Sequence, residues 1–168
     1  EAVAQFKAAA GLEPELVLAP YNLALNYLQL GLTASAQEAL NEVLARDPEH
    51  AGALAARGTL LFEAGQHEAA AASYRAALEQ EPDHPEAITN MGACLLALQR
   101  PAEAEPYIRR AIDLEGESAV ALTNLALAQA AQGNIAEAEQ HVARALQLNP
   151  DYTQAQALGQ RIAQFREM

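Results

Sequence analysis

The chain has 168 residues, of which 51% are hydrophobic, and its 22 acidic and 10 basic side chains give a formal net charge of −12. Surfaces that bind nucleic acid or anionic membranes need clustered Lys and Arg, so this charge balance argues against both partners. No run of about 18 or more apolar residues is present, so no membrane insertion is expected. The single cysteine, Cys94, excludes an internal disulfide and leaves the compartment open.

Helix-ending residues recur through the chain with one fixed period of 34 residues. They are Pro14, Pro48, Pro82 and Pro150, with Gly116 in the remaining position. An alanine lies twelve residues before each of these helix-ending residues, and a large apolar residue lies four positions after each alanine. These pairs are Ala2 with Phe6, Ala36 with Leu40, Ala70 with Tyr74, Ala104 with Ile108, and Ala138 with Val142. A fixed period of this length indicates an array of similar small units.

In chain order, the period divides the chain into a half unit, four full units and a final helix. The expected ranges are 1–16 for the half unit, 17–50, 51–84, 85–118 and 119–152 for the full units, and 153–168 for a C-terminal capping helix. Each full unit contains two segments rich in Ala, Leu, Glu and Gln, which are strong helix formers. The eighth position of each first segment is small, which lets paired helices approach closely; it holds Ala24, Gly58, Gly92 and Ala126.

The two ends of the chain differ. In the last segment Ala155, Leu158 and Ile162 form one apolar stripe and polar residues cover the remainder, as expected of a cap. At the start, Val3 and Phe6 belong to a helix whose partner is missing. We therefore expect the chain to be cut from a longer array at its amino end, with an open face there that allows self-association.

These patterns resemble the tetratricopeptide repeat, whose signature is W-x2-L-G-x2-Y, then A-x3-F, then P, over 34 residues. No tryptophan occupies the fourth position, but the resemblance covers essentially the whole chain. It implies one all-α domain, a right-handed α-solenoid of antiparallel helix pairs. The best-matching stretches are Met91-Gly92 with Leu95, Leu23-Ala24 with Tyr27, and Ala70 with Tyr74 and Pro82.

The resemblance also implies that the first helices line a concave groove. The sixth position of the four full units reads Asn22, Ala56, Asn90 and Asn124, which is similar to the asparagine ladder in the repeat domain of O-linked N-acetylglucosamine transferases. Asparagine donates and accepts hydrogen bonds at once, so it pairs with a peptide bond of any sequence. The alternative is that these asparagines bond one another or the adjacent helix.

Other expected peptide contacts in the groove are apolar or carry a hydroxyl. Aromatic residues contribute much of the binding energy in grooves, and the concave positions hold no Lys or Arg to bind an acidic peptide tail. The candidates are Tyr21, Leu25, Phe62, Thr89 and Thr123.

No catalytic, phosphate-binding or zinc-protease motif is present. His50 and His84 lie one period apart in expected turns but lack further metal ligands, so we interpret them as exposed turn residues. We predict an interaction scaffold that holds a peptide segment or partner helix, with no enzyme activity, cofactor or metal. Two alternatives stay open: a substrate-recruiting or regulatory arm of a larger enzyme such as a glycosyltransferase, and a self-assembly module.

Overall fold

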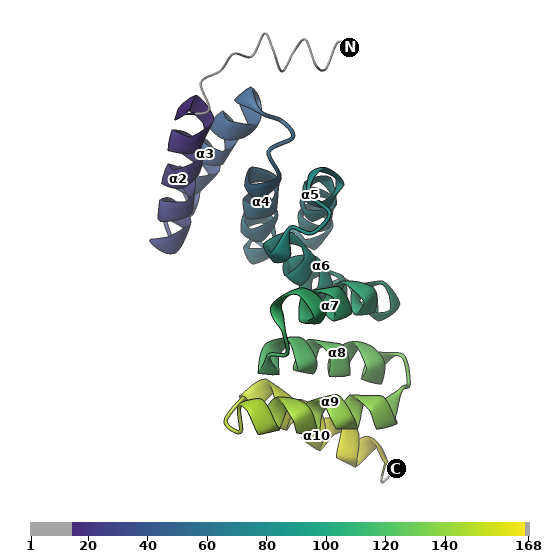
Figure 1. The fold of residues 1–168 in the computed structure, drawn as a ribbon. Coiled ribbons are helices and arrows are strands. Elements are labelled where there is room, and N and C mark those ends of the chain that lie inside the picture. Colours follow the sequence, from purple (N-terminus) through teal and green to yellow (C-terminus); the bar gives the residue numbers. More distant parts are fainter. Residues whose placement is uncertain (1–14, 167–168) are drawn as a thin grey trace.

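A computed structural model describes residues 15–166 of the chain, and within them the side chains of residues 17–164. This part folds into helices joined by short turns and contains no strand (Figure 1). In chain order the helices are α2 (Glu15–Gln29), α3 (Thr33–Arg46), α4 (Ala51–Glu63), α5 (His67–Gln80), α6 (Pro85–Ala97), α7 (Pro101–Glu115), α8 (Ala119–Ala131), α9 (Ile135–Leu148) and α10 (Thr153–Arg166). The predicted all-α solenoid is confirmed. The expected half unit 1–16, and with it the open amino-terminal face, falls outside the described residues except for the start of α2.

The helices pair and stack in one direction, from α2 at one end to α10 at the other (Figure 1). The pairs are α2 with α3, α4 with α5, α6 with α7, and α8 with α9. From α4 onward, the first helix of each pair also contacts the first helix of the next pair, while the second helix of each pair contacts chiefly its own first helix and the first helix that follows. The side formed by the first helices is therefore the inner side of the stack.

The core of the stack consists of the residues that repeat. The alanines Ala36, Ala70, Ala104 and Ala138 have no exposed surface, and the large apolar residues four positions later are buried against the first helices. Space for them comes from the small eighth position. A Cβ at Gly58 would lie 2.6 Å from Cε1 of Tyr74, so the buried tyrosine ring needs a glycine there.

The turn within each pair is formed by a residue with positive φ. Gly31, Gly65 and Gly133 have φ of 68°, 74° and 85°. Gln99 occupies the same position of the third unit with φ 58°. Glycine adopts this conformation without the steric cost that a side chain imposes. The repeated backbone therefore imposes the turn even where the sequence departs from glycine.

The first helices begin with side-chain caps that also follow the period. The Ala53 N–H donates to His50 Nδ1 at 3.1 Å, the Ala87 N–H to His84 Nδ1 at 3.3 Å, and the Ala121 N–H to Ser118 Oγ at 3.1 Å. Each cap satisfies a backbone donor that has no partner inside the helix. His50 and His84 are thus half-buried helix caps, not the exposed turn residues that we expected from the sequence.

Candidate functional site

The inner face is the surface formed by the second, fifth, sixth, ninth, twelfth and thirteenth positions of α2, α4, α6 and α8. Several apolar side chains on it are open to solvent, including Leu18 at 49%, Val120 at 50% and Leu127 at 36% exposure. Its charged residues are Glu63 and Glu86, and none of these positions holds Lys or Arg. The inner face is therefore apolar with a weak negative charge.

The predicted aromatic residues lie at the boundaries between helices. The Tyr21 ring is tilted against His50, with 4.6 Å between ring centroids, and its hydroxyl end lies over Gly52. Burial raises the pKa of Tyr21, and the carboxylates of Glu86 and Glu81 raise it further. Phe62 makes a similar ring contact with His67 at 4.9 Å. Tyr21 and Phe62, like the aliphatic Leu25, are half-buried, so each packs between helices and keeps part of its surface exposed.

The three asparagines of the predicted row have different surroundings. Asn22 is exposed, and its side chain has no hydrogen-bond partner among residues 17–164. The half-buried Asn90 donates from Nδ2 to Thr59 Oγ1 at 3.2 Å. Asn124 is also half-buried, and in the described part of the chain its amide has no partner. The alternative of bonding to an adjacent helix thus holds for Asn90, whereas Asn22 and Asn124 leave their amides available.

A hydrogen-bond cluster centred on Thr59 fills the junction between the second and third units. The Thr59 hydroxyl accepts from Asn90 Nδ2 and from the Tyr74 hydroxyl at 3.3 Å. It lies 3.3 Å from the Ala55 carbonyl and 3.2 Å from the Glu86 carboxylate, either of which can take its proton. A hydroxyl has one proton and two lone pairs, so Thr59 is fully satisfied. Burial raises the pKa of Tyr74 to about 12, although the hydrogen bond to Thr59 acts in the opposite direction.

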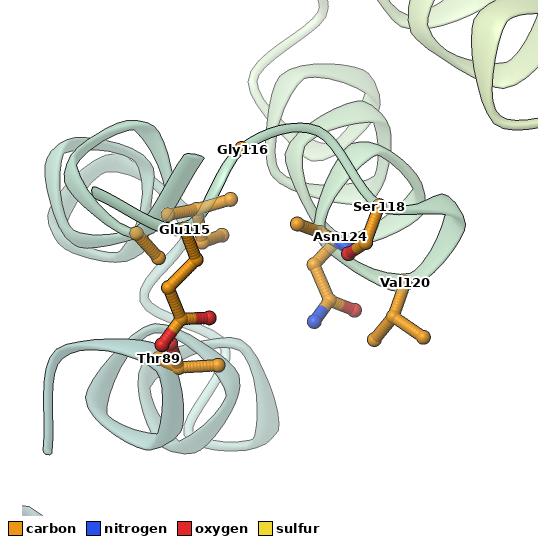
Figure 2. A pocket seen from close by; sticks show the side chains of 9 residues that line it. Thr89, Glu115, Gly116, Ser118, Val120 and Asn124 are labelled. Carbon is orange, nitrogen blue, oxygen red and sulfur yellow. The ribbon is translucent and has the colours of Figure 1, made fainter. Parts of the chain in front are cut away.

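The next junction, between the third and fourth units, is open. One period after Thr59, Tyr74 and Asn90 come Ala93, Ile108 and Asn124. The two hydroxyls of the cluster have therefore no counterpart here, and a cavity of about 230 Å³ lies between the units (Figure 2). Ile108, Ala111, Val120 and Ala121 form its apolar lining, and its polar lining includes Thr89, Glu115, Ser118 and Asn124.

The two predicted threonines differ although they hold the same position in successive units. Thr123 is only 6% exposed, and its hydroxyl donates to the Ala119 carbonyl of its own helix at 2.6 Å. Thr123 therefore belongs to the core, and it offers almost no surface for binding although it holds an inner-face position. The Thr89 hydroxyl is also buried, but it has no hydrogen-bond partner among the described residues, and Thr89 lines the cavity. Of the predicted site residues, the structure brings Thr89 and Asn124 together.

The sequence-based prediction did not include Thr59 or the cavity residues Glu115, Ser118 and Val120. One signal was available, because Gly116 interrupts the proline series at this junction. Gly116 has φ 88°, a value that a proline cannot adopt, and it borders the cavity. The departure from the period thus marks the place where the junction differs.

The described residues offer no group of three or more His, Cys, Asp or Glu that is placed to hold a metal ion. Between residues 15 and 166, none of the helices has the combined length and hydropathy needed to cross a bilayer. Cys94 is buried and donates from Sγ to the His67 carbonyl at 3.1 Å, and burial raises the pKa of its thiol. A buried, protonated thiol is a poor nucleophile.

Sequence profiles described as tetratricopeptide repeat match residues 21–87 and residues 83–151. The chain belongs to the tetratricopeptide-repeat family. Among solved structures, it is similar to YrrB, with a TM-score of 0.81 and 20% identity over 96% of this chain and 84% of that one. PilF of Pseudomonas aeruginosa has a TM-score of 0.75 and 26% identity over 92% of this chain and 71% of PilF. The first repeat domain of Spaghetti has a TM-score of 0.65 and 24% identity, covering 73% of this chain and 97% of that domain. No curated protein sequence matches the chain.

Tetratricopeptide folds serve generally as protein-interaction modules. The asparagine row similar to that of O-linked N-acetylglucosamine transferases stays a prediction.

Proposed function

We propose that the chain is an interaction scaffold that binds a peptide segment of a partner protein along its inner face and catalyses no reaction. The observation that carries the proposal is the set of exposed apolar side chains and of amides without a protein partner on that face. Leu18, Val120 and Leu127 are exposed, and the Asn22 and Asn124 amides have no partner in the described part of the chain. Apolar side chains beside unpaired amides suit a peptide, which supplies side chains and peptide bonds together.

The spacing of the first helices favours an extended segment. Packed helices lie roughly 10 Å apart, and an extended chain advances about 3.3 Å per residue. Every third residue of such a segment would therefore meet the next first helix. Asn22 on α2 and Asn124 on α8 hold the same position three units apart, so they would meet peptide bonds about nine residues apart.

Two structural neighbours support peptide binding as a use of this fold. YrrB is described as having an unusual peptide-binding site, and the Spaghetti domain was solved with the HSP90 peptide SRMEEVD. The carboxylates of an acidic peptide need Lys or Arg as charge-assisted donors. Because the inner face here has none, we propose a neutral or basic peptide as its partner.

The test is selection of peptides from a random library displayed on phage, followed by affinity measurements with the 168-residue chain. Leu127→Asn on the inner face is expected to lower the affinity for the selected peptides about tenfold, because an apolar contact in a groove contributes on the order of 1–2 kcal/mol. Leu148→Asn in α9 is the matched control, since Leu148 is similarly exposed, at 43%, but lies on a second helix. Failure to select any peptide, or equal losses in both variants, would contradict the proposal.

A further inference from the structure

The cavity between the third and fourth units contains polar groups that the protein itself leaves unpaired. The Thr89 hydroxyl is buried without a partner. The Glu115 carboxylate and the Asn124 amide form no ion pair or side-chain hydrogen bond among residues 17–164. In Figure 2 the Glu115 carboxylate extends toward Thr89, and the Asn124 amide points into the same space from the opposite side. Of these three groups the Thr89 hydroxyl is the buried one, and a buried polar atom without a partner costs about 1–3 kcal/mol. Glu115 is exposed and Asn124 is half-buried, so a ligand that enters beside them and pairs the Thr89 hydroxyl gains free energy.

The rest of the lining is apolar and limits the size of the ligand. Ile108 and Ala111 are buried beneath the cavity, and Val120 stands at its edge. A volume of about 230 Å³ is below the range of roughly 300–1,000 Å³ typical of small-molecule sites. It suits one long side chain, whose aliphatic part would contact Ile108 and Val120.

We propose that this cavity binds a lysine side chain of the captured peptide, an inference that rests on the proposed function of the inner face. A lysine ammonium is compact and carries three donors. The cavity offers oxygen acceptors from three side chains, those of Glu115, Thr89 and Asn124. The Glu115 carboxylate supplies the opposite charge, and the four-carbon stem covers the apolar lining.

Other side chains fit these groups less well. A neutral aliphatic side chain would leave the Thr89 hydroxyl unpaired and would desolvate the Glu115 carboxylate without compensation. An acidic side chain would be repelled by Glu115. The planar guanidinium of arginine suits bidentate contact with one carboxylate. The acceptors here belong to three residues on both sides of the cavity, so arginine fits them less well.

The preceding junction provides an internal control for this proposal. Glu81 stands one period before Glu115, and its junction is filled by the Thr59 and Tyr74 cluster. Both glutamates are exposed and lie at the C-terminal ends of second helices, α5 and α7. Glu115→Gln and Glu81→Gln therefore remove the same charge from equivalent positions, one beside the cavity and one beside a closed junction.

The experiment is a titration of the ¹⁵N-labelled chain with N-acetyl-L-lysine N-methylamide, followed by NMR. We expect resonance shifts at the Thr89 and Gly116 amides and at the Asn124 side-chain amide, with affinity that falls as salt rises. The uncharged norleucine analogue and the arginine analogue are expected to bind at least about fivefold more weakly. Glu115→Gln should weaken binding of the lysine probe about tenfold and reduce its salt dependence, whereas Glu81→Gln should change both much less.

Several results would overturn the inference: shifts confined to other parts of the chain, equal affinity for the norleucine analogue, stronger binding of the arginine analogue, or equal effects of the two glutamine variants. Its failure is distinguishable from failure of the scaffold. If the selected peptides contain no lysine and their affinity is unchanged by Glu115→Gln, the lysine site is contradicted and the proposed scaffold function is retained. If no peptide is selected but the lysine probe still binds the cavity, the proposed scaffold function is contradicted and the lysine site is retained.

Discussion

Asn90 and Asn124 occupy the same position in successive units, but their amides have different surroundings. At the junction of the second and third units, Thr59 and Tyr74 place their hydroxyls beside Asn90, and the Thr59 hydroxyl accepts from both Tyr74 and Asn90. At the junction of the third and fourth units, Ala93 and Ile108 replace them, and the Asn124 amide borders a cavity. Both hydroxyls of the closed junction are therefore replaced by apolar side chains at the equivalent positions of the open one. In a repeat protein, a binding site can arise where one unit omits the groups that satisfy its neighbour.

The largest expected difference between the two junctions appears at alkaline pH. Tyr74 has a pKa of about 12 in the folded chain, against 10.0 for an unperturbed tyrosine. Between these values the unfolded chain has released the proton and the folded chain still holds it, so proton release favours unfolding. The free energy of unfolding should therefore fall as pH rises from 10 toward 12, by about 2–3 kcal/mol from this residue.

Urea unfolding of the parent chain and of Tyr74→Phe at several pH values checks this expectation. The variant should lose about 1 kcal/mol near pH 8, where the parent retains the hydrogen bond to Thr59, and should show a smaller decline above pH 10. Tyr107→Phe, outside the Thr59 cluster, is the control and should keep the decline of the parent. An unchanged decline in Tyr74→Phe would show that the closed junction does not hold its tyrosine as described.

The sequence predicted the features that the two junctions share, but it did not predict the cavity that distinguishes them. The period located the helices and the buried Tyr74 and Ile108, because helix ends and core positions depend on local residue type. The cavity depends on residues from three helices together, so no single position in the sequence predicts it. Thr89 and Thr123 could not be told apart either, since a helical threonine bonds its own backbone or a neighbour according to its rotamer. The His50 and His84 caps likewise depend on ring orientation, which the residue type does not fix.

The eighth-position glycines give a second, smaller difference. A Cβ at Gly58 would lie 2.6 Å from Cε1 of Tyr74, and a Cβ at Gly92 would lie 2.7 Å from Cγ1 of Ile108. The Tyr74 ring is fully buried and hydrogen-bonded, whereas Ile108 has the cavity beside it. Alanine gains about 1 kcal/mol over glycine in helix propensity at both sites, and overpacking costs about 1–3 kcal/mol where nothing can move.

We therefore expect Gly58→Ala to lower the free energy of unfolding by about 1–2 kcal/mol in net terms, because overpacking there exceeds the gain in helix propensity. Gly92→Ala should stay within about 0.5 kcal/mol of the parent, since Ile108 can shift into the cavity. Parallel denaturant titrations measure both. Because the shifted Ile108 would occupy part of the cavity, Gly92→Ala should also weaken binding of the lysine probe. Equal losses in the two variants would mean that the open junction is as rigid as the closed one.

A gain in stability is expected from converting the open junction into the closed one. The double variant Ala93→Thr with Ile108→Tyr restores the two hydroxyls beside Asn124, and Gly92 leaves room for the ring as Gly58 does for Tyr74. Filling the cavity and pairing the amide should raise the free energy of unfolding by about 1 kcal/mol, which thermal unfolding would record as an increase of about 2–4 °C. Binding of the lysine probe should fall at least tenfold. Ile108→Tyr alone is the control: its hydroxyl lacks the threonine partner, so it should close the cavity with little or no gain in stability. If the double variant is more stable but still binds the probe, the probe occupies another site; if it is destabilised, the two junctions differ in backbone geometry as well as in side chains.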